Sequence, residues 1–263
     1  MSSKTNRREA VAPALPQPQA GRCPWPAPPP NPALRPGETH LWCAEPGAFH
    51  QHLSRFNGLI SEAEQDRAAR FHSAGHRDAY IIRHGVLRLL LGQYLRQAPA
   101  EIEFLHGSRG KPVIPAAASE LHFNESHSGD LALFAFTTVC PIGVDIERIR
   151  PIPDFERIAT HYFSAQEVHM MRELPPDQRM KAFYACWTGK EAYLKATGEG
   201  IGAGLDKVEI TLDQNLEAAG LTVSEDSHAA WRLHPFSPAP GYLGAVALTG
   251  TITALSLWRF PAY

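Results

Sequence analysis

Two stretches of the chain, one in each half, place apolar residues at the spacing of a long amphipathic helix. The first runs from about His76 to Leu95 and the second from about Pro176 to Lys195. The repeating apolar positions are Ile81, Val86, Leu89, Leu90 and Tyr94 in the first stretch, and Phe183, Trp187 and Leu194 in the second. The pattern therefore predicts one long helix in each half.

A shorter helix precedes each long one, and both short helices begin with the same capping motif. Ser61-Glu62-Ala63-Glu64 and Ser164-Ala165-Gln166-Glu167 each place a serine three residues before a glutamate, which is the arrangement of a capping box. The motifs predict short helices that end near Phe71 and Leu174. They lie 103 residues apart, which indicates that the two halves share one layout.

Strand-like sequence surrounds these helices in both halves. The predicted strands are Thr39–Trp42, Ile102–Phe104 and Leu131–Phe136 in the first half, and Val208–Leu212 and Gly244–Leu248 in the second. We therefore predict an α+β fold of two similar subdomains, residues 39–138 and 139–263, related by pseudo-twofold symmetry. Each subdomain is expected to be an antiparallel sheet packed with helices, and their junction is expected to form a ligand cleft.

The first 38 residues differ from the rest because they are dense in proline. Seven prolines fall between residues 24 and 36. Proline removes a backbone donor and fixes φ, so residues 1–38 are predicted to form an extended, disordered tail. A Pro-rich ligand for a partner domain is the alternative interpretation.

Charge and cysteine content exclude several classes of protein. The 263-residue chain has 25 Lys and Arg against 27 Asp and Glu, so no strong field indicates a nucleic acid or an anionic membrane as partner. No apolar run approaches the ~18 residues that span a bilayer, and Pro-rich sequence stands where a signal peptide would be apolar. The cysteines form no CxxC pair, so we expect reduced thiols in a cytoplasmic protein.

Acidic residues alternate with apolar ones in the predicted strand Gly143-Val144-Asp145-Ile146-Glu147. Asp145 and Glu147 share one strand face, and Val144 and Ile146 share the other. The simplest interpretation is a half-exposed strand with a solvated acidic face. A second acidic element is needed to favour a binding site.

The second long helix supplies that element. Trp187, Glu191 and Lys195 lie at i, i+4 and i+8, so they share one helix face. A surface ion pair between Glu191 and Lys195 is the simplest interpretation. Trp187 on the same face indicates burial, and a buried pair of this kind is costly without a further purpose.

The three carboxylates together predict a metal site if Glu191 lies beside Asp145 and Glu147. Like unit charges about 4 Å apart repel by roughly 4 kcal/mol at an effective dielectric constant of 20, so the group needs a cation. An all-oxygen ligand set favours Mg²⁺ or Mn²⁺, and Mg²⁺ often completes its shell with water and a substrate phosphate. The prediction is a magnesium-dependent enzyme with a phosphate-bearing substrate.

Two further segments suit the binding of phosphate oxygens. Gly110-Lys111-Pro112 places a lysine in a loop, and Asn124-Glu125-Ser126-His127-Ser128-Gly129 carries hydroxyls and an imidazole at a strand end. Taken alone, the second segment is equally an ordinary polar turn.

These segments together resemble the 4′-phosphopantetheinyl transferases of the larger, pseudo-dimeric, single-chain type, the surfactin-synthetase-activating-like enzymes. The resemblance rests on three signatures in order, from about residue 40 to about residue 248. They are Gly110-Lys111-Pro112 with Asn124-Glu125-Ser126-His127; Gly143-Val144-Asp145-Ile146-Glu147; and Trp187-Thr188-Gly189-Lys190-Glu191-Ala192-Tyr193-Leu194-Lys195.

The resemblance implies an activity. A transferase of this type moves the 4′-phosphopantetheine group of its substrate coenzyme A to a serine of an apo acyl or peptidyl carrier protein, and adenosine 3′,5′-bisphosphate is the by-product. The reaction depends on Mg²⁺. Because both halves of the cleft come from one chain, the resemblance also implies a monomer.

The resemblance also implies roles for individual residues. Asp145, Glu147 and Glu191 would coordinate the metal. Glu191 would also be the general base, and Lys195 would contact the pyrophosphate and stabilise the departing phosphate. Further coenzyme A contacts are expected from Arg67, Lys111, Ser126 and His127.

This chain departs from the family pattern at two places. Glu64 stands where relatives often carry a cation for the 3′-phosphate, while Arg67 fits a neighbouring basic position. Arg70, Arg77 and Arg83 are all candidates to replace the missing cation. Thr188-Gly189 replaces a commoner serine and bulky residue, and a mid-helix glycine costs about 1 kcal/mol, which suggests a close backbone approach there.

Two other functions remain as alternatives. A non-catalytic module that binds carrier proteins is expected to have lost a carboxylate or Lys195, and this chain retains them. Another Mg²⁺-dependent phosphotransferase or nucleotide hydrolase is expected to carry a Gly-rich phosphate loop of the form GxxxxGK[ST], and the sequence has none. The identity of the carrier protein is not readable from these motifs.

Overall fold

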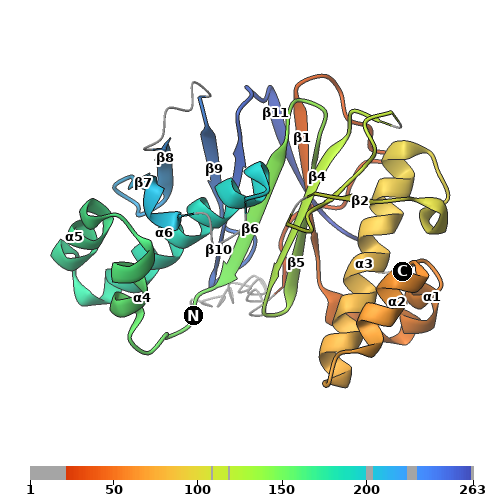
Figure 1. The fold of residues 1–263 in the computed structure, drawn as a ribbon, viewed down its shortest axis with the longest axis horizontal. Coiled ribbons are helices and arrows are strands. Elements are labelled where there is room, and N and C mark those ends of the chain that lie inside the picture. The colour runs from red at the N-terminus through yellow and green to blue at the C-terminus, as the bar shows by residue number, and fades with distance from the viewer. Residues whose placement is uncertain (1–21, 108, 118, 200–203, 224–229, 262–263) are drawn as a thin grey trace, which may run out of the picture.

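The computed structural model describes residues 22–107, 109–117, 119–199, 204–223 and 230–261. Its two halves stand side by side, with their sheets in the middle of the molecule and their helices at opposite ends (Figure 1). Helices α1–α3 belong to the first half and α4–α6 to the second. The predicted α+β fold with two sheet-plus-helix regions is confirmed.

In the first half, three α-helices pack on a four-stranded sheet in the order β11-β1-β5-β4. The helices are α1 (Leu53–Asn57), α2 (Glu62–Ala69) and α3 (Ala74–Leu95), with 3₁₀ turns at Pro46–His52 and Pro99–Glu101. The strands are β1 (Glu38–Ala44), β4 (His122–Ser128), β5 (Leu131–Thr137) and β11 (Ala254–Arg259), and β2 (Leu105–His106) forms a short hairpin with β3 (Pro112–Val113).

The second half repeats this plan around a three-stranded sheet in the order β6-β10-β9. Its helices are α4 (Phe155–Tyr162), α5 (Ala165–Glu173) and α6 (Pro176–Thr197), with a 3₁₀ turn at Leu205–Lys207. The strands are β6 (Ile142–Arg148), β9 (Arg232–Phe236) and β10 (Tyr242–Leu248), and β7 (Val208–Leu212) pairs separately with β8 (Ala218–Val223).

The helix predictions that rest on local sequence are confirmed. Ser61 with Glu64 and Ser164 with Glu167 both form complete capping boxes, which satisfy backbone N–H groups at the starts of α2 and α5. Helices α3 and α6 each have 22 residues and occupy the predicted stretches. None of the described helices is long and apolar enough to cross a membrane.

The predicted strand Ile102–Phe104 does not form, and regular pairing begins only at Leu105. Ile102 is buried against the first helical core, and its carbonyl oxygen accepts a hydrogen bond from Arg88 Nη1 at 3.0 Å. This side-chain bond and the preceding Pro99–Glu101 turn take the place of a strand ladder.

The described residues form three apolar cores, one in each half and one between the halves. One lies between the first sheet and α1–α3, and a second lies under α4–α6. The third joins residues of both sheets, including Leu133 of β5 and Val144 of β6. Strand β5 is buried along its whole length because Phe134 belongs to the first core and Leu133 to the third.

The last strand returns to the first half of the molecule. Strand β11 pairs in parallel with β1, in the register Leu41 to Leu257. The predicted boundary at residues 138 and 139 therefore does not divide the strands by sequence order, and the first sheet is not purely antiparallel. The chain therefore passes between the two halves twice, once from β5 to β6 and once from β10 to β11.

The Pro-rich stretch differs from the predicted disordered tail wherever the structure describes it. Within residues 22–37, Cys23 and Trp25 are buried against the body of the protein, with exposures of 1% and 8%. The backbone N–H of Arg259 donates to the carbonyl of Pro26 at 2.8 Å. Proline density concealed these apolar anchors, because composition alone does not show what an extended segment contacts. Residues 1–21 lie outside the described part of the chain.

Candidate functional site

The two sheets meet where β4 lies beside β6, and side chains rather than a backbone ladder join them. Every second residue of β4 points toward β6: these residues are Asn124, Ser126 and Ser128. Asn124 Oδ1 accepts a hydrogen bond from the backbone N–H of Val144 at 2.8 Å. The polar pattern of this segment therefore has a structural cause that the sequence interpretation missed.

The acidic residues of β6 receive the other two bonds. Ser126 Oγ donates to Asp145 Oδ1 at 2.8 Å, and Ser128 Oγ donates to Glu147 Oε2 at 2.6 Å. Asp145 is only 4% exposed, which rules out the simple interpretation of a solvated acidic strand face.

Helix α6 lies directly on β6, and Gly143 makes this contact possible. A Cβ atom built on Gly143 would overlap the backbone of Ala192 and Ala196 in α6. Ala192 and Ala196 follow Glu191 and Lys195 in sequence. The contact therefore brings both of these side chains of α6 to the acidic strand.

Lys195 pairs with Asp145 rather than with Glu191. Its Nζ lies 2.6 Å from Asp145 Oδ1 and donates to Ser126 Oγ at 2.8 Å. The expected i,i+4 surface pair is replaced by a closed network of lysine, serine and aspartate. The prediction that this helix face is buried is confirmed, since Glu191 is 8% exposed.

The three carboxylates are incompletely neutralised. Burial, together with the nearby charges of Asp145 and Glu147, raises the pKa of Glu191 to about 7 despite the opposing effect of Lys195. Burial also raises the pKa of Glu147, opposed by the Ser128 hydrogen bond. Among the described residues, the buried atoms Asp145 Oδ2 and Glu191 Oε1 have no hydrogen-bond partner.

This donor set suits a hard divalent cation, although the ligands are not gathered into a closed cage. Within the described ranges, no three His, Cys, Asp or Glu side chains converge as a metal site. Two unpartnered, buried carboxylate oxygens are costly without a cation. The carboxylate chemistry thus fits Mg²⁺ or Mn²⁺ with a shell completed by water and substrate.

Lys111 does not reach the carboxylates. Its Nζ donates to the carbonyl oxygens of Ile142 at 3.1 Å, Ala196 at 3.2 Å and Lys195. Burial lowers the pKa of Lys111 to about 8. Its positive charge complements the C-terminal end of α6, so in this structure Lys111 ties the β2–β3 loop to the helix that carries Glu191.

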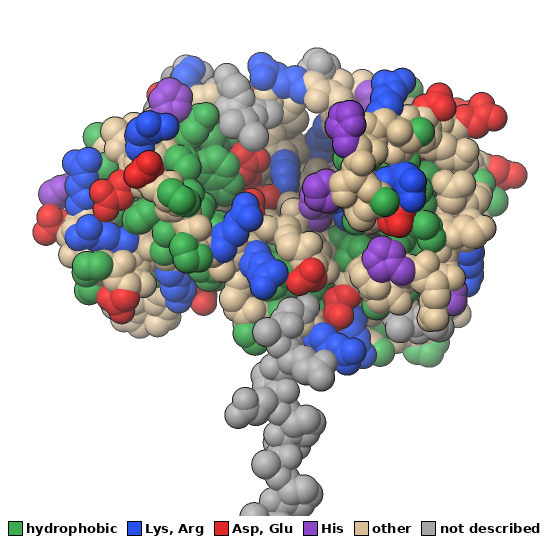
Figure 2. All heavy atoms as spheres, turned by 90° about the horizontal axis from the view of Figure 1, so that it is seen from below, with side chains coloured by type: hydrophobic (Ala, Val, Ile, Leu, Met, Phe, Trp, Pro, Cys, Tyr) green, Lys and Arg blue, Asp and Glu red, His purple; other side chains and the backbone are tan. Residues whose placement is uncertain are grey.

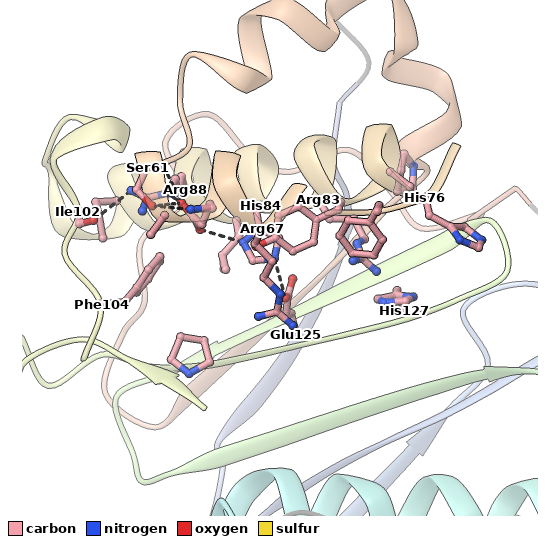
Figure 3. Close-up of a pocket in the computed structure, with 18 of the residues that line it drawn as sticks. Ser61, Arg67, His76, Arg83, His84, Arg88, Ile102, Phe104, Glu125 and His127 are labelled. Carbon is pink, nitrogen blue, oxygen red and sulfur yellow. Dashed lines mark hydrogen bonds and ion pairs between the residues drawn. The ribbon is translucent and has the colours of Figure 1, made fainter. Parts of the chain in front are cut away.

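A large cleft of about 1280 Å³ lies on the other side of β4, beneath α2 and α3. Arg67, Arg83 and His127 line it, together with aromatic residues such as Tyr80 and Phe104. Figure 3 shows Arg67, Arg83 and His127 between α3 and β4. Figure 2 shows the molecule hollowed near its middle, with charged side chains beside the hollow.

Successive side chains of β4 point alternately into the cleft and toward the carboxylates. Glu125 and His127 line the cleft, whereas Ser126 between them bonds Asp145. The structure therefore brings Ser126 together with Asp145 and Lys195, and it places Arg67 and His127 in the cleft.

Glu64 has a structural role that explains its departure from the family pattern. It closes the capping box of α2 and contacts Arg88 Nε at 2.7 Å and His84 Nδ1 at 2.8 Å. Burial opposes ionisation, but the bonds from His84 and Ser61 and the Arg88 charge lower the pKa of Glu64 to about 2.

Of the three candidates Arg70, Arg77 and Arg83, it is Arg83 that lines the cleft with Arg67. Its Nε is buried without a hydrogen-bond partner among the described residues, and burial lowers its pKa against the attraction of Glu125. Arg77 instead pairs with Asp78 at 2.9 Å. The signal available in the sequence was a pair of polar residues, Arg83-His84, inside the apolar pattern of a long helix.

Gly189 also shows the close approach predicted for it. A Cβ atom there would lie 3.1 Å from Ile210 Cδ1 and 3.3 Å from Leu233 Cδ1. The neighbouring Lys190 is fully buried, pairs with Glu167 at 2.8 Å and donates to the carbonyls of Leu205 and Val208. These contacts fix α6 against β7 on the side away from the carboxylates.

Comparisons with known proteins cover both halves. Residues 141–247 match the family described as the 4′-phosphopantetheinyl transferase superfamily, and residues 44–139 match the family described as 4′-phosphopantetheinyl transferase, N-terminal. The chain is 38% identical over 238 residues to the 4′-phosphopantetheinyl transferase HetI of Nostoc sp., covering 90% of this chain and 98% of the relative.

Two further relatives show the same similarity. A putative 4′-phosphopantetheinyl transferase of Synechocystis sp. is 32% identical over 220 residues, covering 83% of this chain and 79% of the relative. The 4′-phosphopantetheinyl transferase Sfp of Bacillus subtilis is 30% identical over 192 residues, covering 73% of this chain and 83% of the relative.

The contact at Gly143 generates a stability prediction. Gly143→Ala is expected to destabilise the protein by about 1–3 kcal/mol, because the added methyl group has no room against the backbone of α6. Gly47→Ala is the matched control, since a Cβ atom at Gly47 meets nothing within 4 Å. Urea unfolding of both variants checks the prediction, and equal midpoints for the two variants and wild type would contradict it.

Proposed function

Since the chain belongs to the 4′-phosphopantetheinyl transferase superfamily, we propose that it transfers the 4′-phosphopantetheine group of coenzyme A to a serine of an apo acyl or peptidyl carrier protein. Adenosine 3′,5′-bisphosphate is the second product. The observation that carries the proposal is the pair of buried, unpartnered carboxylate oxygens of Asp145 and Glu191 beside a cleft lined with arginines.

The cleft has the chemistry to bind the nucleotide part of coenzyme A. Arg67 and Arg83 supply guanidinium groups suited to phosphate oxygens, and His127 adds a further donor from β4. The Arg67 guanidinium lies 5.7 Å from the centre of the Tyr80 ring, which fixes its position in the cleft. Arg83 supplies the cation that Glu64 cannot provide.

Asp145, Glu147 and Glu191 would hold Mg²⁺, or Mn²⁺ in its place. When bound, the cation would neutralise negative charge on the pyrophosphate of the substrate. Burial and the neighbouring negative charges raise the pKa of Glu191 and of Glu147, and a cation that pairs with their ionised forms would offset this cost.

The proposed roles of Glu191 and Lys195 follow from charge and burial. Glu191 would accept the proton of the carrier serine, since its buried Oε1 has no hydrogen-bond partner among the described residues. The serine Oγ then bonds to the β-phosphorus of coenzyme A as the bond from that phosphorus to the bridging oxygen breaks. The Lys195 ammonium, oriented by Ser126, would stabilise the negative charge on the departing phosphate.

Two alternative functions are less well supported. A non-catalytic carrier-binding module needs neither desolvated carboxylates nor Lys195 among them, and both are present. A different Mg²⁺-dependent phosphotransferase does not fit the match of both halves to one transferase family.

We further propose a monomeric, cytoplasmic enzyme. Both the cleft and the carboxylates are formed within one chain, so no second copy is needed to complete the site. All four cysteines are free thiols, three of them buried, which supports a reducing compartment.

Intact-mass measurement tests the transfer directly. Incubation with coenzyme A, Mg²⁺ and a panel of apo carrier proteins from fatty-acid, polyketide and nonribosomal-peptide pathways should add one 4′-phosphopantetheine group to at least one carrier. The mass gain should vanish when the metal is chelated. A panel without any mass gain would contradict the proposed function.

Glu191→Gln should reduce kcat by roughly a hundredfold or more, because the amide cannot accept the proton of the serine. Lys181→Gln, which alters a lysine whose Nζ donates to the carbonyl oxygen of Asn215 in the β7–β8 turn, is a control expected to keep wild-type rates. Near-normal turnover by Glu191→Gln would exclude the general-base role.

Glu191→Gln should lower kcat but should raise the stability of the folded protein near neutral pH. The pKa of Glu191 in the folded, metal-free protein is about 7, above its usual value of 4.5, so the folded state binds the proton more tightly. Stability that this proton contributes below pH 4.5 is therefore lost as the pH rises to about 7. Glu191→Gln should remove this loss, on the order of 2 kcal/mol. Urea unfolding in chelator at pH 5 and pH 8 checks it, and an unchanged pH dependence would contradict it.

A further inference from the structure

The N-terminal segment 22–37 lies outside the two family matches, which cover residues 44–139 and 141–247, yet it contacts both halves of the protein. On the first half, the carbonyl of Pro32 accepts a hydrogen bond from Gln93 Nε2 of α3 at 3.3 Å, and Leu34 packs on the first core. Toward the other end of the segment, Trp25 packs against Phe236 of β9 in the second half. The segment is therefore a strap between the halves.

Trp25 closes the core that the two sheets share. It is 8% exposed and belongs to the same apolar cluster as Leu41 of β1 and Val144 of β6. Its ring meets Phe236 edge-on, with centroids 5.8 Å apart. An edge-to-face aromatic contact stabilises the packed state beyond the apolar area that it buries.

Phe236 continues the line of contacts to the acidic strand. It pairs with Gly244 across β9 and β10, and Gly244 pairs with Ile146 of β6. A Cβ atom on Gly244 would lie 2.6 Å from Phe236 Cε2 and 2.8 Å from the carbonyl oxygen of Asp145. The Phe236 ring therefore lies directly on the strand pair that carries Asp145, on the face opposite α6.

We propose that Trp25 is a positioning residue for the transfer reaction. By supporting Phe236, it keeps β6 pressed against α6, so that Asp145 stays in contact with Lys195. This inference rests on the proposed function of the Asp145 site. The prolines of the strap assist because a fixed φ lowers the entropy lost when the segment is ordered.

The position of Trp25 determines which kinetic constant it affects. Its contacts are to the strands of the second half and the shared core, whereas Arg67 and His127 line the cleft from α2 and β4. Loss of the Trp25 ring should disturb the carboxylates and leave the nucleotide cleft intact. The effect should fall on kcat rather than on the KM for coenzyme A.

Trp25→Ala, Trp25→Phe and Leu34→Ala, all in the full-length chain, form the test. Trp25→Ala should lower kcat roughly tenfold to a hundredfold, as small displacements of reacting groups do, with the KM for coenzyme A within twofold of wild type. Trp25→Phe should restore most of the rate. Leu34→Ala, in the same strap but packed only on the first half, should keep kcat within twofold.

Hydrogen exchange gives a readout that does not depend on activity. Backbone amides of β9 and β10 should exchange at least about tenfold faster in Trp25→Ala than in wild type, while those of α3 remain unchanged. If Trp25→Ala does not fold, Trp25→Leu replaces it in both measurements.

The outcomes separate this inference from the proposed function. Unchanged exchange in β9 and β10, a rise in KM alone, or an equal loss of kcat in Leu34→Ala would each overturn the role of Trp25. Absence of transfer by the wild-type protein with every carrier would overturn the proposed function, and the kinetic role of Trp25 with it, whereas the exchange measurement would still decide whether Trp25 supports these strands.

Discussion

The contact between α6 and β6 at Gly143 is the constraint on which the rest of the site depends. The helix backbone occupies the space that any larger residue at position 143 would need. This closeness sets Lys195 within 2.6 Å of Asp145 and buries Glu191 beside the same strand. The side chains of β4 then reach the acidic strand from the opposite half, so the junction of the two halves and the candidate site are one structure.

Burial of three acidic residues at this junction has opposite consequences for stability and function. Desolvation raises the pKa of Glu191 and of Glu147, which weakens the metal-free fold near neutral pH. The same desolvation favours the binding of a cation that pairs with the ionised carboxylates. Lys195 offsets only part of the negative charge, so the site retains negative charge that a bound cation would neutralise.

Features set by local sequence were predictable, whereas those set by distant partners were not. The capping boxes at Ser61 and Ser164 and the carboxylate spacing of β6 could be identified because each depends on neighbours a few residues away. The pairing of β11 with β1 and the carbonyl partners of Lys111, up to 85 residues away, depend on the tertiary fold. Trp25 was missed because the surrounding prolines resemble those of a tail, and burial is a property of the whole fold.

The most direct test of the central claim is Mn²⁺ binding measured by electron paramagnetic resonance in the presence of coenzyme A. We predict one bound ion per chain in wild type and at least about tenfold weaker binding in Asp145→Asn, because the amide removes one of the three negative charges that would hold the cation. Glu156→Gln, which removes an exposed carboxylate that pairs with Arg179, is the control that should bind normally. Equal Mn²⁺ affinity in wild type and Asp145→Asn would contradict the assignment of the acidic junction as the metal site.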